Sequence, residues 1–158
     1  MNNIILCGFK SSGKTTLGKK IAEKTGLHFI DTDELVSKNC RQLYLQGPEA
    51  FREIEKEVIG ALVGFEHCVI ATGGGAILDP ANVAILKKLG KIFYLRVPKE
   101  ELRRRLLADP LPAFLDLNNP EESFEEMYEA RKDLYEQIAD EVIDTEEQCL
   151  EIISRDFG

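Results

Sequence analysis

Short apolar runs alternate along the chain with longer stretches in which apolar residues recur every three or four positions. The runs predict five buried strands, at Asn3–Cys7, His28–Ile30, Cys68–Ala71, Ile92–Val97 and Glu141–Asp144. The periodic stretches predict helices over Lys14–Thr25, Asp33–Asn39, Glu49–Phe65, Pro80–Lys88, Lys99–Leu107, Ser123–Glu136 and Glu147–Arg155. For the helix that starts at Ser123, Glu126 three positions later completes a capping-box pattern.

Strands that alternate with helices favour right-handed crossovers and a parallel sheet that is covered on both faces. We therefore expect a three-layer α/β/α fold with a mostly five-stranded parallel sheet. The chain of 158 residues has the length of one domain and contains no internal repeat or linker, so we expect a single domain over 1–158. Proline and polar turn residues predict a loop over Asp109–Asn119, within a lid at about 107–120.

Charge and cysteine content exclude several classes of function. The net charge of −8 disfavours binding to nucleic acid or to an anionic membrane, because both require a concentrated positive surface. The four cysteines are scattered and the only histidines are His28 and His67, so the spacing argues against a zinc site. With no signal-peptide pattern at the start and no membrane-length apolar run, we expect a cytoplasmic protein, and a monomer.

The segment Gly8–Thr15 matches the phosphate-loop pattern G-x-x-x-x-G-K-[ST] in full, directly after a predicted strand and at the start of a helix. Such a loop presents backbone amides to phosphate oxygens, the lysine reaches the β- and γ-phosphates, and the hydroxyl ligates Mg²⁺. The predicted fold is therefore of the P-loop nucleoside-triphosphate-hydrolase type, with ATP as co-substrate and Mg²⁺ as cofactor. The predicted ATP-binding residues are Gly8, Ser11, Ser12, Gly13, Lys14, Thr15 and Thr16, with Lys14 also catalytic. The alternative is an ordinary turn before a helix.

Two carboxylates follow the second predicted strand, at the sheet edge where ligands bind in open α/β folds. The two carboxylates, Asp31 and Asp33, could hold Mg²⁺ through water and accept a proton from an attacking hydroxyl. Helix capping by Asp33 is the alternative. The consecutive glycines Gly73–Gly75 follow the third strand at the same edge, where a ligand could reach bare backbone amides; a flexible turn is the alternative.

Arg52 and Arg131 lie in two different predicted helices. If both point into the cleft, their guanidinium groups form a fork that matches a substrate carboxylate. Ordinary surface arginines are the alternative at each position.

Taken together, these residues resemble the shikimate kinase family over essentially the whole chain: Gly8–Thr15, Asp31-x-Asp33, Gly47–Phe51-Arg52, Gly73–Gly75 and Arg131-x-x-Leu134-Tyr135. The resemblance implies ATP-dependent phosphorylation of the 3-hydroxyl of shikimate, a step of aromatic amino-acid biosynthesis. It also implies roles for individual residues. Asp33 is the base, Asp31 holds the Mg²⁺ water shell, Arg52 and Arg131 bind the substrate carboxylate, Phe51 packs on its ring, and Gly74 and Gly75 hold a ring hydroxyl.

The chain departs from the family pattern in three places. Members usually carry Arg-Pro-Leu in the lid, where the arginine reaches the transferring phosphate, but this chain has Asp109 at that point. Either Arg103, Arg104 or Arg105 replaces that cation, or turnover is weak, or the lid aligns differently. Pro48 replaces a common glutamate, and the segment after Asp144 lacks a frequent adenine-stacking arginine.

Two other functions stay open at this point. Another P-loop small-molecule kinase, for gluconate or a nucleoside monophosphate, would use the same phosphate loop, and gluconate also offers a carboxylate to the two arginines. An ATP-binding module that has lost catalysis is conceivable because of Asp109, although the phosphate loop and both carboxylates favour an enzyme.

Overall fold

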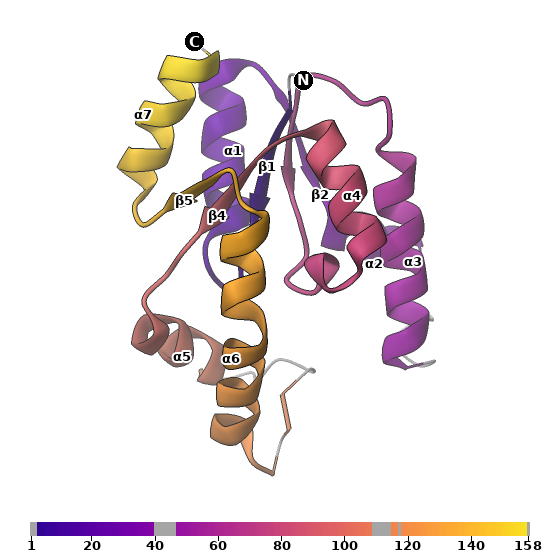
Figure 1. The fold of residues 1–158 in the computed structure, drawn as a ribbon, viewed down its shortest axis with the longest axis vertical. Coiled ribbons are helices and arrows are strands. Elements are labelled where there is room, and N and C mark those ends of the chain that lie inside the picture. The colour runs from indigo at the N-terminus through magenta and orange to yellow at the C-terminus, as the bar shows by residue number, and fades with distance from the viewer. Residues whose placement is uncertain (1–2, 40–46, 109–114, 117, 158) are drawn as a thin grey trace.

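The computed structural model describes residues 3–39, 47–108, 115–116 and 118–157. Its sheet has five strands in the order β2-β3-β1-β4-β5, and every neighbouring pair is parallel (Figure 1). The strands are β1 (Asn3–Cys7), β2 (His28–Asp31), β3 (Cys68–Ala71), β4 (Gly90–Leu95) and β5 (Glu141–Ile143). The expected three-layer α/β class is confirmed.

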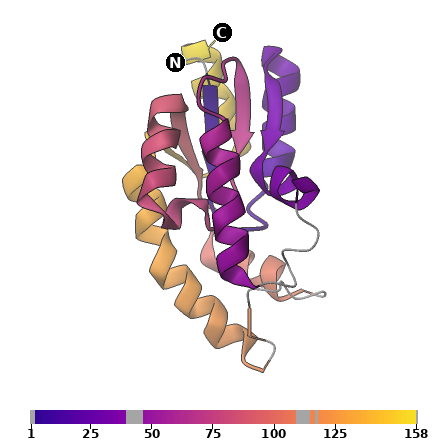
Figure 2. The ribbon, with the colours of Figure 1, turned by 90° about the vertical axis from the view of Figure 1, so that its right-hand side faces the viewer.

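Helices connect the strands and cover the sheet on both sides (Figure 2). They are α1 (Lys14–Thr25), α2 (Thr32–Asn39), α3 (Pro48–Ala61), the 3₁₀ turn η2 (Ala76–Leu78), α4 (Pro80–Leu89), α5 (Lys99–Leu107), α6 (Pro120–Ile138) and α7 (Glu146–Phe157). No helix in these ranges is long and apolar enough to cross a membrane.

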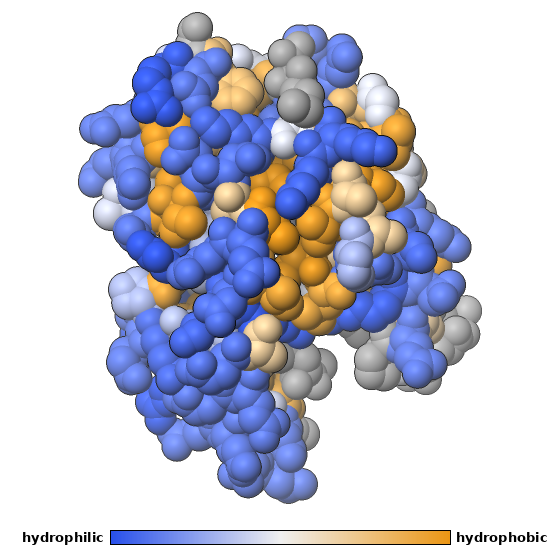
Figure 3. Space-filling model, in the orientation of Figure 1, coloured by the Kyte–Doolittle hydropathy of each residue, from blue (hydrophilic) through white to orange (hydrophobic). Residues whose placement is uncertain are grey.

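Alternate residues of β1 supply two separate cores. Ile4 and Leu6 pack on one face, in a cluster that includes residues of α1 and α7. Ile5 and Cys7 pack on the other face, in a cluster that draws on α3, α4, α5 and α6. All of β1 is fully buried because helices cover both faces of this central strand. On the outside, polar residues dominate, and hydrophobic residues gather near the centre of the face in Figure 3.

One boundary error concerns α6, which begins at Pro120 and not at Ser123. The capping-box prediction is therefore wrong, since Ser123 lies inside the first turns of the helix. Its Oγ instead accepts the backbone N–H of Asp116 at 3.2 Å, which fixes the chain just before the helix. The helix prediction over Glu49–Phe65 also ran too far, because α3 ends at Ala61.

Much of the predicted lid lies outside the described residues, at 109–114 and 117. Asp109 is one of these residues. Its place in the lid, opposite the family's usual arginine, therefore stays a prediction from the sequence. The described neighbours on either side are the last turn of α5 and the residues before α6.

Candidate active site

Three loops meet at the carboxyl edge of the sheet. The phosphate loop follows β1, Asp31 ends β2, and the glycine loop Gly73–Gly75 follows β3. The register pairs Leu6 with Ala71 and Ala71 with Asp31, so the three strands end at nearly the same level. The topology thus brings these segments, which are far apart in sequence, to one edge.

The phosphate loop has the backbone that its glycines allow. Gly13 has φ 97° at the start of α1, and Ser11, also with positive φ at 67°, makes the loop curl. The Lys14 ammonium group turns back into the loop and donates to the carbonyls of Gly8 at 2.6 Å and Phe9 at 2.8 Å. Ser12 is buried in the loop, whereas Thr16 is exposed in the first turn of α1. The loop therefore combines a buried cation with the amide end of a helix, which suits a polyphosphate.

The environment of Lys14 changes its protonation. Burial lowers the pKa of this ammonium group to about 8, although the nearby carboxylates of Asp33 and Asp31 favour the charged form. Only the ammonium form attracts phosphate, so nucleotide capture weakens as pH rises through this value.

This shift predicts an alkaline limb in the activity of the enzyme. We expect kcat/KM for ATP to fall above about pH 8, because kcat/KM reports the ionisation of the free enzyme. At saturating ATP, kcat should fall only at higher pH, since bound phosphate stabilises the ammonium form. Steady-state kinetics between pH 6 and 10 measure both limbs, and a kcat/KM that stays flat to pH 10 would contradict the assignment.

Asp31 links the second strand to the phosphate loop. Its Oδ2 accepts the hydroxyl of Thr15 at 3.0 Å, and its Oδ1 accepts the backbone N–H groups of Asp33 and Glu34. The cap of α2 is therefore made by Asp31, so the alternative interpretation of Asp33 as the capping residue is wrong.

The Thr15 hydroxyl and the Asp31 carboxylate fit Mg²⁺. Both supply hard oxygen ligands, and Mg²⁺ typically takes one or two protein ligands together with phosphate oxygens and waters. Among the residues that the structure describes, no group of three or more His, Cys, Asp or Glu side chains could form a dedicated metal cage. The donor set therefore suits a metal that arrives with a nucleotide.

Asp33 lies against the glycine loop. A Cβ atom added at Gly73 would collide with its Oδ1 and would lie 3.1 Å from Oε2 of Glu55. Although Asp33 as a residue is exposed, partial desolvation of its carboxyl group and the nearby Asp31 raise its pKa, while Lys14 opposes the shift. A raised pKa makes this carboxylate a better proton acceptor than an ordinary Asp.

Arg52 reaches the same loop from α3. Its Nη1 donates to Oε1 of Glu55 at 2.8 Å, and the site of a Cβ on Gly75 is already filled by its guanidinium nitrogens. The Glu55 side chain is 1% exposed while that of Arg52 is 42% exposed. The buried carboxylate thus holds a guanidinium group whose other side remains accessible.

Glu55 was missed by the motif analysis. Burial raises its pKa, the pairing with Arg52 opposes that shift, and Oε2 has no hydrogen-bond partner within the described ranges. A signal was present, because Arg52 and Glu55 are three positions apart on one face of a helix. We interpret Glu55 as a positioning residue for Arg52.

Arg131 approaches from α6 on the opposite side of the glycine loop. A Cβ at Gly74 would lie 3.7 Å from its Nη1 and 3.8 Å from the carbonyl of Gly8. The buried Tyr135, one helical turn later, donates its hydroxyl to the carbonyl of Gly74, and its ring packs edge-on against Phe9 at 4.9 Å between centroids. Helix α6 is thereby anchored to both the glycine loop and the phosphate loop.

Phe51 is half-buried beside this cluster, with its ring 5.7 Å from the guanidinium carbon of Arg52.

The predicted site residues come from four parts of the fold. These are the phosphate loop with the start of α1, the turn from β2 into α2, the glycine loop, and the helices α3 and α6. The glycine loop is the common neighbour of Asp33, Arg52 and Arg131.

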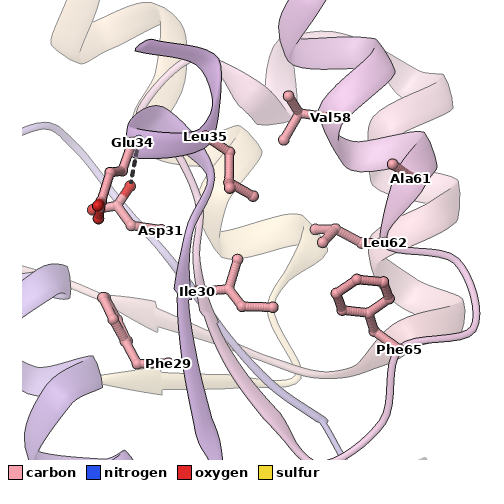
Figure 4. Close-up of a pocket in the computed structure, with 9 residues that line it drawn as sticks. All are labelled: Phe29, Ile30, Asp31, Glu34, Leu35, Val58, Ala61, Leu62 and Phe65. Carbon is pink, nitrogen blue, oxygen red and sulfur yellow. Dashed lines mark hydrogen bonds between the residues drawn. The ribbon is translucent and has the colours of Figure 1, made fainter. Parts of the chain in front are cut away.

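A separate apolar cavity lies on the far side of the turn from β2 into α2. It has a volume of about 420 Å³, and the side chains of Ile30, Leu35, Leu62 and Phe65 point toward one another in it (Figure 4). The Asp31 and Glu34 carboxyl groups lie at one end. Of the predicted site residues, Asp31 alone lines this cavity.

The close contact between Gly75 and the Arg52 guanidinium group leads to a testable prediction. In Gly75→Ala the new Cβ displaces the Arg52 guanidinium group from its pair with Glu55, so we expect KM for the acceptor to rise about tenfold, the equivalent of one charge-assisted hydrogen bond. KM for ATP should change little. Gly60→Ala is the matched control in α3, because a Cβ there meets no atom within 4 Å. That control should stabilise the fold by about 0.5–1 kcal/mol with unchanged kinetics. An unchanged acceptor KM in Gly75→Ala would contradict the placement of Arg52.

Comparisons with known proteins identify the family of this chain. The sequence profile of the shikimate kinase family matches residues 10–157. A shikimate kinase from Thermodesulfovibrio yellowstonii is 40% identical over 92% of this chain and 87% of that relative, and one from Caldanaerobacter subterraneus subsp. tengcongensis is 35% identical over 99% and 94%. The solved structure of shikimate kinase from Acinetobacter baumannii in complex with shikimate superposes with a TM-score of 0.89 at 30% identity, over 100% of this chain and 96% of that one. The chain belongs to the shikimate kinase family.

Proposed function

We propose that this protein transfers the γ-phosphoryl group of ATP to the 3-hydroxyl of shikimate, giving shikimate 3-phosphate and ADP. The observation that carries the proposal is the convergence of Asp33, Arg52 and Arg131 on the glycine loop, beside the phosphate loop. A base and two guanidinium groups next to a polyphosphate site suit an acceptor that has both a hydroxyl and a carboxylate.

On the nucleotide side, the amides of the phosphate loop and of the α1 N-terminus bind the phosphates, and Lys14 pairs with the β- and γ-phosphate oxygens. Thr15 and Asp31, whose side chains are in contact at 3.0 Å, would hold Mg²⁺, Thr15 as a direct ligand and Asp31 through water. Bound there, the ion neutralises charge on the phosphate oxygens.

On the acceptor side, Arg52 and Arg131 bind the carboxylate of shikimate, one from α3 and one from α6. Phe51 packs on the ring, and the amides of Gly74 and Gly75 hold a ring hydroxyl. A Cβ at Gly75 would collide with the Arg52 guanidinium group, whereas a Cβ at Gly74 would lie in ordinary contact with Nη1 of Arg131, at 3.7 Å.

In the transfer step Asp33 accepts the proton of the 3-hydroxyl while the new oxygen–phosphorus bond forms. The bond between the γ-phosphorus and the bridging oxygen breaks, and ADP leaves with the electron pair. Catalysis comes from positioning and electrostatics, with no covalent enzyme intermediate. The site draws on residues of a single chain, so we propose that a monomer, folded as one domain over residues 1–158, is sufficient.

Coupled ADP-release assays with ATP, Mg²⁺ and a panel of acceptors test this function. We expect turnover with shikimate to exceed that with gluconate or nucleoside monophosphates by at least about 100-fold, because a site built for specific polar groups rejects ligands that lack them. Faster turnover with another acceptor would refute the proposed substrate. Nucleotide binding without acceptor-dependent ADP formation would show a binding module instead.

A further inference from the structure

Three consecutive arginines in the last turns of α5 have different partners. Arg103 pairs with Glu121 at the start of α6, and Arg104 donates to Glu101 with two nitrogens. Arg105 alone among the three bonds to the phosphate loop, where its Nη1 donates to the carbonyl of Ser11 at 3.0 Å. Residues 94 positions apart are joined by this bond.

The Arg105 guanidinium group is held from two directions. Its Nε donates to Glu101 at 2.9 Å, four positions earlier on the same helix, and its Nη1 donates to Ser11. A guanidinium group has five N–H donors, and these two bonds engage two of them. The side chain is 38% exposed, so its remaining donors can reach a ligand at the loop.

The position on the loop is informative. Ser11 lies in the loop between Phe9, whose carbonyl accepts a hydrogen bond from the Lys14 ammonium group, and Gly13, where α1 begins. Lys14 reaches the β- and γ-phosphates in such loops, and Arg105 bonds to a carbonyl of the same loop, so both cations lie at the segment that binds a polyphosphate.

The segment that follows Arg105 contains no other cation that could reach the phosphate loop. From Leu106 to Ala130 the chain has no Lys or Arg, so the connection between α5 and α6 contributes no positive charge to the nucleotide, and it carries Asp109. A transferring phosphoryl group needs cations around its developing charge. Arg105 is the last cation before this acidic connection.

We propose that Arg105 is a catalytic residue that donates hydrogen bonds to the γ-phosphoryl group during its transfer. This inference rests on the proposed kinase function and deepens it. Ser11 and Glu101 preorganise the guanidinium group, so that little reorganisation is needed when the phosphate charge develops.

Kinetics of Arg105→Ala, compared with wild type, test the proposal. We expect kcat to fall about 100-fold, the typical loss for one donor aimed at the transition state. The dissociation constant of ADP, which lacks the γ-phosphoryl group, should stay within about threefold, since the lost contact carries little of its binding energy. Added guanidinium chloride, far below denaturing concentrations, should restore part of the lost kcat. Arg103→Ala in α5 and Arg155→Ala in α7 remove the same charge away from the loop and should keep wild-type kcat.

A kcat within a few-fold of wild type would overturn the proposal. A parallel loss of kcat and ADP affinity without rescue by guanidinium would also overturn it, because Arg105 would then only shape the loop. The proposed substrate is judged separately from the acceptor panel. If the wild type phosphorylates another acceptor instead of shikimate, the same comparison with that acceptor still decides the role of Arg105. A wild type without any turnover would overturn both.

Discussion

Asp33→Asn is expected to lower kcat for shikimate phosphorylation by about 1000-fold, in the middle to upper range for the loss of a general base. The amide cannot accept the proton of the attacking hydroxyl. It has nearly the same shape as the carboxylate, so it should fit against Gly73 without disturbing the loop. ATP affinity should remain close to wild type, because Asp33 lies outside the phosphate loop Gly8–Thr15.

The pH profile gives a second readout for Asp33. Its pKa is raised, so in the wild type the rate should fall as pH drops through that raised value, at higher pH than for an ordinary Asp. In Asp33→Asn that acid limb should disappear from the residual activity. Asp133→Asn, which removes an exposed carboxylate on α6, is the control and should behave as wild type. Full activity of Asp33→Asn would refute the assignment of the base.

The second large effect concerns Lys14. Lys14→Met keeps the length of the side chain but removes the charge, so we expect kcat to fall by about 1000-fold, as expected for the loss of a preorganised cation at the transferring phosphoryl group. ADP affinity should fall as well, since the same ammonium group pairs with the β-phosphate. The effect on ADP distinguishes Lys14 from Asp33 and from Arg105.

Thermal unfolding serves as the control for Lys14→Met. The substitution relieves the cost of burying a charge and loses the bonds to Gly8 and Phe9, so we expect the two effects to offset and Tm to change by only a few degrees. Lys24→Met, at the exposed end of α1, removes the same charge and should retain wild-type kinetics. Near-normal turnover of Lys14→Met would mean that the loop does not deliver this lysine to the phosphates.

The fold was largely predictable because β1, β3 and β4 are buried on both faces and therefore appear as apolar runs. The turn from β2 into α2 was located to within one residue, since Asp31 both ends the strand and caps the helix. The start of α6 was missed because the helix begins at Pro120, after Asn119, without a side-chain cap. The pair Ser123 and Glu126 matches the capping-box sequence pattern although both residues lie inside the helix.

The site was only partly predictable, for reasons of distance along the chain. The phosphate loop is local, so eight consecutive residues identify it. The approach of Arg52 and Arg131 to Gly75 and Gly74 depends on how α3 and α6 pack around the sheet, which no local pattern encodes. The resemblance to the shikimate kinase family supplied that information, and the family assignment is confirmed.

Glu55 lay beyond both kinds of inference, and Arg105 could be named from the sequence only as one of three candidate cations. Glu55 occupies a buried position in a helix that reads as amphipathic, and only its contact with Arg52 reveals why a carboxylate is there. Arg105 is one of three adjacent arginines with the same chemistry. Their roles differ because each points to a different neighbour, which the sequence alone cannot specify.

A structure of the protein bound to shikimate, ADP and Mg²⁺ would test the central claim most directly. We predict the shikimate carboxylate between Arg52 and Arg131 and the 3-hydroxyl within hydrogen-bond distance of Asp33, facing the β-phosphate of ADP across the gap left for the transferred group. Shikimate bound elsewhere, or with its 3-hydroxyl turned away from Asp33, would contradict the account.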